Sequence, residues 1–148
     1  MDNNSYLEKI ERVYQLISTC PDPDKREADG GWSIKEVVGH LLDSLSNNHQ
    51  RLLRYEEKGI LDFPGYNQEL FVKRANYQAF EFSTLVSLWY NYNKLLLHIY
   101  DSIPPENLSS TIKVGERPAV TIEQLMKDYF THMENHERQV QSIIDAQT

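Results

Sequence analysis

The sequence contains a single cysteine, and what it has little of already excludes several classes of protein. Cys20 cannot form an internal disulfide, which fits a protein that stays in a reducing compartment. Glycine and proline occur only 6 times each, too seldom for a collagen-like or low-complexity chain. We therefore expect an ordinary globular protein without a disulfide framework.

Basic charge and long hydrophobic runs are also scarce. The chain has 15 Lys and Arg against 22 Asp and Glu, a formal net charge of -7, which does not favour nucleic acid or an anionic membrane as a partner. The longest aliphatic run, Leu95–Leu97, is far short of the roughly 20 residues of a membrane span. Residues 1–5 are polar and acidic, unlike a secretory signal. We expect a cytoplasmic protein with no nucleic-acid and no membrane partner.

Length and apolar spacing predict one all-α domain over residues 1–148. This is an ordinary length for a single domain, and 40% hydrophobic residues suffice for one core. Apolar residues recur at intervals of three and four, which is the helical period. The spacing predicts four amphipathic helices, through residues 7–17, 34–52, 85–99 and 122–143. We expect them to form a four-helix bundle.

Start and stop signals frame these helices. Three segments fit the capping-box pattern, in which side chains of the first turn satisfy backbone donors: Ser5-x-x-Glu8, Ser33-x-x-Glu36 and Thr121-x-x-Gln124. Cys20-Pro21 ends the first helix, since proline disfavours helix in the residue before it. Gly59 is the expected C-cap of the second helix, whose dipole suits the basic residues near that end, Arg51, Arg54 and Lys58.

The segments between the helices are less regular. Residues 59–82 form a long connection rich in aromatic residues, and we expect it to pack across the end or side of the bundle. Thr111–Arg117 is typical of a short extended piece or small hairpin. In the third helix, the spacing predicts that Leu85 and Leu88 face the core.

The last helix places two histidines on its apolar stripe. His132 and His136 are four residues apart, so their Cβ atoms lie roughly 6 Å apart on one face. One metal ion can join two such imidazoles, with each bond about 2.0–2.1 Å long. The alternative is an ordinary pair of surface or hydrogen-bonded core histidines. Glu134 lies only two residues from His132 and points elsewhere, so the pattern is not the HExxH motif of zinc proteases.

A third histidine would complete a metal site, and the second helix offers two candidates. His40 and His49 lie on opposite faces of that helix, so at most one of them joins a shared site. At 100° per residue, His49 falls on the flank of the apolar stripe, whereas His40 lies about 130° from its centre. Helical periodicity therefore favours His49. His40 remains a candidate for the third ligand, because a ligand near a helix crossing need not lie on the apolar stripe.

Two segments resemble the DinB/YfiT-like metalloenzyme family. Residues 31–44, GWSIKEVVGHLLDS, look like its opening Trp-Ser helix start with a His-Leu step. Residues 132–140, HMENHERQV, look like its H-x-x-x-H-x-x-Q element, and the resemblance covers nearly the whole chain. It implies an up-down-down-up bundle with a metal held by three histidines, which here match His40, His132 and His136. We follow the motif over the periodicity and take His49 as the fallback.

The resemblance also implies a function. The metal would be zinc or nickel, and the protein a homodimer. The reaction would be transfer of a low-molecular-weight thiol to a small electrophile, or hydrolysis of a small-molecule substrate. Three neutral imidazoles leave a metal with an open coordination position, which suits either reaction, although no general base can be named. The alternative is a non-catalytic metal- or ligand-binding helical domain with a stress-response or interaction role.

Overall fold

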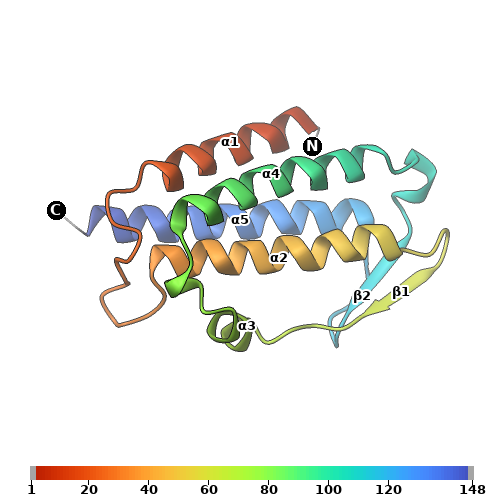
Figure 1. The fold of residues 1–148 in the computed structure, drawn as a ribbon. Coiled ribbons are helices and arrows are strands. Elements are labelled where there is room, and N and C mark those ends of the chain that lie inside the picture. The colour runs from red at the N-terminus through yellow and green to blue at the C-terminus, as the bar shows by residue number, and fades with distance from the viewer. Residues whose placement is uncertain (1–2, 147–148) are drawn as a thin grey trace.

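The computed structural model describes residues 3–146, and four long helices make up most of it. They are α1 (Asn3–Ser18), α2 (Ile34–Arg54), α4 (Phe82–Asp101) and α5 (Ile122–Asp145). In Figure 1, α1 and α5 run in one direction, and α2 and α4 run in the opposite direction. This up-down-down-up four-helix bundle confirms the predicted all-α fold. Within the residues described, no helix is both long and apolar enough to cross a membrane.

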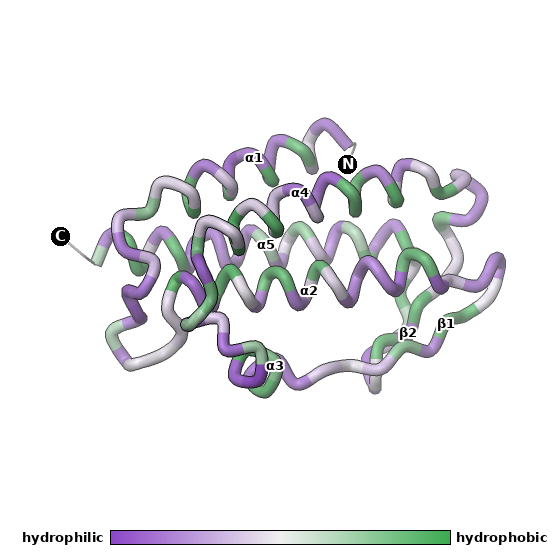
Figure 2. The backbone as a smooth tube through the Cα atoms, viewed as in Figure 1, coloured by the Kyte–Doolittle hydropathy of each residue, from purple (hydrophilic) through white to green (hydrophobic). Residues whose placement is uncertain are grey.

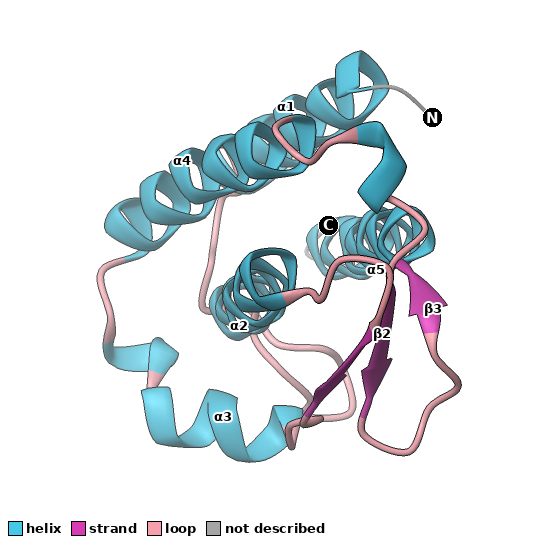
Figure 3. Ribbon diagram, turned by 90° about the vertical axis from the view of Figure 1, so that its right-hand side faces the viewer, coloured by secondary structure: helices cyan, strands magenta, loops and turns pink. Residues whose placement is uncertain are grey.

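The helices form two layers, with a third layer of shorter elements on one side. α4 packs against α1 and α2, and α5 packs against the same two helices. Figure 3 shows α1 and α4 together in one layer, α2 and α5 in the next, and α3 and the strands beyond them. α2 and α5 are therefore covered on both sides, by the other two helices and by the third layer.

The hydrophobic core lies between the two helix layers, and green hydrophobic positions recur along each long helix (Figure 2). The ring of Tyr6 on α1 stacks on Phe130 of α5, with centroids 4.0 Å apart. On α4, Leu85 and Trp89 are fully buried. Leu88, which the spacing placed in the core, is 46% exposed, so that prediction is wrong. The indole of Trp89 takes the inward position one residue further along the helix.

The connections after α2 and α4 form a small sheet. β1 (Ile60–Phe63) pairs in parallel with β2 (Thr111–Val114), and β3 (Val120–Thr121) pairs antiparallel with β2. A short 3-10 helix, η2 (Pro105–Asn107), leads into β2. The extended piece expected at residues 111–117 is confirmed over β2, but its parallel partner β1 was not predicted.

Residues 59–82 contain a helix that the sequence reading did not predict. α3 (Gln68–Ala75) follows Asn67, whose side chain caps its first turn, and ends at Asn76 in the left-handed conformation, with φ of 52°. A short 3-10 helix, η1 (Tyr77–Ala79), comes next. β1, α3 and η1 all contact α2. The connection thus packs across the side of the bundle, as expected.

Two predicted helix ends are wrong. α1 already includes Asn3, so Ser5 lies inside the helix rather than at its N-cap. α2 ends at Arg54, because Tyr55 leaves the helical conformation with ψ of 152°. Gly59 lies beyond that point, in the turn before β1, and is not the C-cap of α2.

The N-termini of α2 and α5 follow the sequence more closely. Ser33 and Glu36 form a complete capping box, in which each side chain accepts a hydrogen bond from the other residue's backbone amide. Thr121 accepts from the amide of Gln124, as predicted. The Gln124 side chain, however, donates to Asp128 at 2.8 Å instead of capping Thr121. These caps fix where the two helices that carry the histidines begin.

Candidate metal centre

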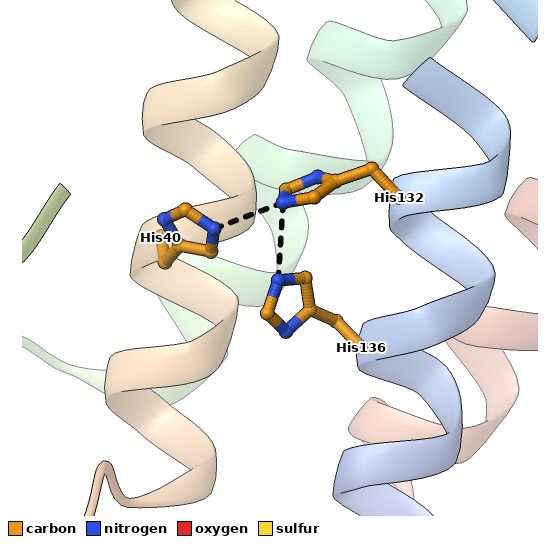
Figure 4. A group of neighbouring side chains, drawn as sticks. All are labelled: His40, His132 and His136. Atoms are coloured by element: carbon orange, nitrogen blue, oxygen red, sulfur yellow. Dashed lines mark hydrogen bonds between the residues drawn. The ribbon is translucent and has the colours of Figure 1, made fainter. Parts of the chain in front are cut away.

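Three histidines from two antiparallel helices meet on the side of α2 and α5 that faces the third layer. His40 extends from α2, and His132 and His136 extend from successive turns of α5 (Figure 4). His132 Nε2 lies 3.1 Å from His40 Nε2 and 3.1 Å from His136 Nε2. His40 is 1% exposed, and the other two side chains are half-buried. The structure thus brings together the three residues that the motif selected.

Neighbouring residues hold the His40 end of the cluster. The indole of Trp32 lies against the His40 ring, with centroids 4.9 Å apart. Gly39 lets the ring of Tyr77 approach α2 closely, since a Cβ at this position would lie 2.1 Å from Tyr77 Cδ2. The Tyr77 hydroxyl donates to Asp43, one turn after His40. This hydrogen bond from Tyr77 to Asp43 therefore holds η1 against α2.

A chain of side-chain contacts fixes the orientation of His136. Its Nδ1 lies 2.6 Å from Gln139 Oε1, and the Gln139 amide donates to the Glu27 carboxylate on the loop before α2. Because the amide oxygen can only accept, His136 Nδ1 carries the proton. The lone pair of the neutral ring is then on Nε2, which points at the cluster. The glutamine of the H-x-x-x-H-x-x-Q element thus sets the tautomer.

Burial keeps the imidazoles neutral. It is the largest cause that lowers the pKa of His40 to about 3 and that of His132 to about 4. The neighbouring rings lower both values further. Burial also lowers the pKa of His136. At neutral pH all three rings are therefore uncharged and can act as ligands, because a metal needs a deprotonated nitrogen.

The three clustered ring nitrogens are better satisfied by one divalent transition-metal ion than by hydrogen bonds to one another. His132 Nε2 faces two ring nitrogens, and its single proton or lone pair serves only one good hydrogen bond. His40 Nδ1 is buried and has no hydrogen-bond partner among the described residues. One nitrogen from each ring could bind a common ion, since the candidate ligand atoms all lie within 4.8 Å of one another.

The other histidines lie elsewhere. His49 Nδ1 is 2.5 Å from the Tyr92 hydroxyl on α4, outside the cluster. Helical periodicity favoured His49, but the structure does not bring His49 to the cluster, and His40 is the third histidine of the group. His98 is exposed on α4. Glu134 forms an ion pair with Lys9 of α1 at 2.6 Å, away from the cluster.

A cavity of about 770 Å³ opens beside the cluster. His40 and His132 line it, together with Tyr66 from the connection before α3. Apolar residues of the sheet and of α5 line much of the rest, among them Ile112 and Leu125. The histidine nitrogens therefore adjoin a space large enough for a small organic molecule.

Sequence reasoning missed one residue of this cavity. Arg51 was named only as a basic residue that suits the dipole at the C-terminal end of the helix, but it is 7% exposed and lines the cavity. The missed signal is a second helical stripe, in which His40, Ser44, Asn48 and Arg51 follow one another at intervals of four, four and three. All four are buried polar residues.

Comparisons with known proteins agree with the fold and the motifs. Over 147 residues, the chain is 24% identical to a protein of Oceanobacillus iheyensis whose name provisionally assigns it to the metal-dependent hydrolases. That alignment covers 95% of this chain and 84% of the relative.

A solved structure shares the fold. It is YfiT from Bacillus subtilis, described as a probable metal-dependent hydrolase with an unusual four-helix bundle topology. It matches with a TM-score of 0.82 and 16% identity, over 99% of this chain and 90% of that chain. Residues 7–140 also match the family profile of the DinB superfamily. Since this match spans nearly the whole bundle, the chain belongs to the DinB superfamily.

Proposed function

We propose that this protein is a metal-dependent enzyme that hydrolyses a small-molecule substrate at the three-histidine cluster. The observation that carries the proposal is the convergence of three neutral Nε2 atoms beside a cavity of about 770 Å³, which two of the three histidines, His40 and His132, line. The names of the relative from Oceanobacillus iheyensis and of YfiT support hydrolysis over other metal-dependent reactions.

In this proposal, each residue of the cluster has a defined part. His40, His132 and His136 hold one divalent transition metal, with zinc or nickel the expected ions. When bound, such an ion supplies Lewis-acid activation of water or of a substrate carbonyl. Gln139 holds His136 in the tautomer that presents Nε2, and Trp32 restricts the ring of His40. The apolar lining of the cavity limits the water around the substrate.

Thiol transfer is the alternative reaction at the same site. Three protein ligands leave a coordination position that accepts a thiolate as readily as water. The two reactions are separated by their products. A hydrolase turns over with water alone, whereas a transferase requires an added low-molecular-weight thiol and joins it to the electrophile.

Metal content tests the site first. Protein purified without a chelator or a nickel column is analysed by mass spectrometry, alongside the variants His132→Ala and His40→Ala. We expect about one metal ion per chain in the wild type and a loss of more than 100-fold in affinity in each variant, because either change removes a ligand. His98→Ala, on the exposed face of α4, is the matched control and keeps its metal. Unchanged metal content in both cluster variants would refute the site.

Activity tests the reaction. We expect the metal-loaded protein to hydrolyse members of a panel of small esters, amides and lactams, and to lose this activity on chelation. Turnover that appears only with an added thiol would replace hydrolysis by thiol transfer. A fourth protein ligand closing the coordination shell, with no turnover in either assay, would favour the non-catalytic metal-binding alternative.

Three further expectations remain predictions. Sedimentation equilibrium tests whether the protein is a homodimer, and cell fractionation tests whether it is cytoplasmic. One cooperative unfolding transition, with calorimetric and van't Hoff enthalpies that agree, is the result expected of a single domain over residues 1–148.

A further inference from the structure

Arg51 is a buried cation without a counter-ion. Its side chain is 7% exposed, and no carboxylate pairs with it among residues 3–146. Nη1 makes one long hydrogen bond, 3.4 Å to Asn48 Oδ1, and Nε has no partner within the described chain. The guanidinium also lies over the ring of Phe63, 5.1 Å from its centroid. A buried charge with so few partners lowers the stability of the fold, so a structural role does not explain why an arginine occupies this position.

The groups around Arg51 do not neutralise its charge with a carboxylate. Burial is the largest cause that lowers the pKa of Arg51; Tyr66 partly offsets it, and the positive charge of Arg117 lowers the pKa further. Arg117 also lines the cavity, but its side chain is exposed. The carboxylates that line the cavity, Glu116 and Asp128, are exposed, and neither forms an ion pair with Arg51. The cavity thus contains a buried positive charge in a chain whose formal net charge is -7.

The position of Arg51 relates it to the histidine cluster. His40, Ser44, Asn48 and Arg51 form one buried polar stripe along α2, and all four line the same cavity. The guanidinium reaches back to Asn48, which is eight residues after His40. With a rise of 1.5 Å per residue, the guanidinium lies about 12 Å along α2 from the cluster. Apolar residues such as Ile112 and Leu125 line the same cavity.

We propose that Arg51 binds the carboxylate of an amphipathic substrate whose reacting group lies at the histidine cluster, about 12 Å away along α2. This inference rests on the proposed function and names its substrate class, a small organic acid with an apolar middle. The unpartnered Nε belongs to an edge of the planar guanidinium that can donate two parallel hydrogen bonds to a carboxylate. The single negative charge of a carboxylate matches that of Arg51, which is the buried cation of the cavity; Arg117, which also lines the cavity, is exposed.

A series of ω-mercapto acids tests the proposal in the cobalt-loaded protein. The thiolate binds the open coordination position, which the sulfur-to-cobalt absorption band reports, and the carboxylate reaches Arg51 only when the chain is long enough. The probes are 3-mercaptopropanoate, 6-mercaptohexanoate and 8-mercaptooctanoate, each paired with the mercapto alcohol of the same length. We expect the acid to bind about tenfold or more tightly than the alcohol for the longer chains, and no such preference for the shortest.

Variants of Arg51 separate anion binding from packing. Arg51→Met removes the charge and keeps the apolar stem, and we expect it to abolish the acid preference without lowering the unfolding temperature. Arg51→Lys keeps a charge but lacks the planar fork, so it should retain part of the preference. Arg54→Met is the matched control, because Arg54 is exposed on the same helix and bonds only Gln50, at 3.1 Å; it leaves the preference unchanged. A merely structural Arg51 would show the opposite result, a lower unfolding temperature in Arg51→Met and an unchanged ratio of acid to alcohol binding.

The outcomes distinguish this inference from the proposed function. If cobalt and the thiols bind but acids and alcohols bind equally at every length, the carboxylate site is wrong and the metal site survives. If no cobalt binds, the proposed function is wrong, and octanoate against octanol in the metal-free protein decides the inference alone. Arg51-dependent preference for octanoate supports it there, and equal binding overturns it. Tighter binding of octyl phosphate than of octanoate would overturn the assignment to carboxylate.

Discussion

The same two helices, α2 and α5, bury two faces of opposite character. Their inner faces pack against α1 and α4 through aliphatic and aromatic side chains, such as Leu45 and Phe130. Their outer faces lie under α3 and the sheet and carry imidazole, hydroxyl, amide and guanidinium groups. The two faces differ in polarity, although residues of both are buried.

The unpartnered polar atoms show what this difference means. Of the four buried side-chain atoms without a hydrogen bond among the described residues, Trp89 Nε1 alone lies on α4. The others are on α2: His40 Nδ1, Asp43 Oδ2 and Arg51 Nε. Burying polar atoms in this way lowers stability unless a ligand satisfies them. The inner face therefore stabilises the fold, and three of the four unsatisfied atoms lie on α2, the helix whose outer face lines the cavity.

Truncation of the inner face should have the largest effect on stability. Phe130→Ala removes a fully buried ring that stacks on Tyr6, so we expect a loss of about 3–5 kcal/mol in the free energy of unfolding. Urea denaturation of the metal-free protein measures it. His132→Ala, on the outer face, should change the same free energy by less than about 1 kcal/mol, since burial disfavours only the charged ring. Equal losses in the two variants would remove the distinction between the faces.

The close approach of the third layer to α2 depends on Gly39. In Gly39→Ala the new Cβ would lie 2.1 Å from the Tyr77 ring, and we expect a loss of about 1–3 kcal/mol in the free energy of unfolding. In a Tyr77→Ala background the same change should be neutral or stabilising, because alanine favours a helix. Gly65→Ala is the control, with nothing within 4 Å of its Cβ, and should have no effect. An equal cost of Gly39→Ala with and without the Tyr77 ring would contradict this account.

The sequence predicts some of these features and not others, for physical reasons. Spacing alone places His132 and His136 together, because residues four apart share a helix face. Helical periodicity gives His40 a low rank as a metal ligand, because the method assumes that a helix buries one face. The helix α2 buries two. Arg51 is missed for the same reason. Nothing within α2 shows that distant residues, 59–82 and 111–121, will cover its polar stripe.

The contact between His136 and Gln139 should affect metal affinity but not the free energy of unfolding. Gln139→Ala removes the acceptor at 2.6 Å that holds the His136 tautomer, so we expect metal affinity to fall about tenfold. Isothermal titration with zinc measures the affinity. The unfolding free energy of the metal-free protein should be nearly unchanged, and Gln141→Ala, exposed in the next turn of α5, serves as the control. Unaltered zinc affinity would mean that Gln139 does not orient the ring.

The metal-free protein should lose stability in mild acid, because the histidines on the outer faces of α2 and α5 are buried as neutral rings. The pKa values of His40 and His132 are lowered to about 3 and about 4, whereas an unfolded histidine titrates near about 6.5. Between these values the unfolded chain binds more protons, so stability falls as pH drops below about 6.5 and is independent of these groups above it. We expect a loss of more than about 1 kcal/mol by pH 5 in urea denaturation, and a smaller loss in His40→Gln. Identical pH profiles in the two proteins would show that the His40 ring is not buried as a neutral group.

We propose that the three imidazoles share one metal ion, and X-ray absorption at the edge of the bound metal would show its ligands. We expect three imidazole nitrogens at about 2.0–2.1 Å and one exchangeable light ligand, with the imidazole signal reduced in His132→Ala. A coordination shell made of carboxylate oxygens, or one that is the same in wild type and His132→Ala, would contradict it.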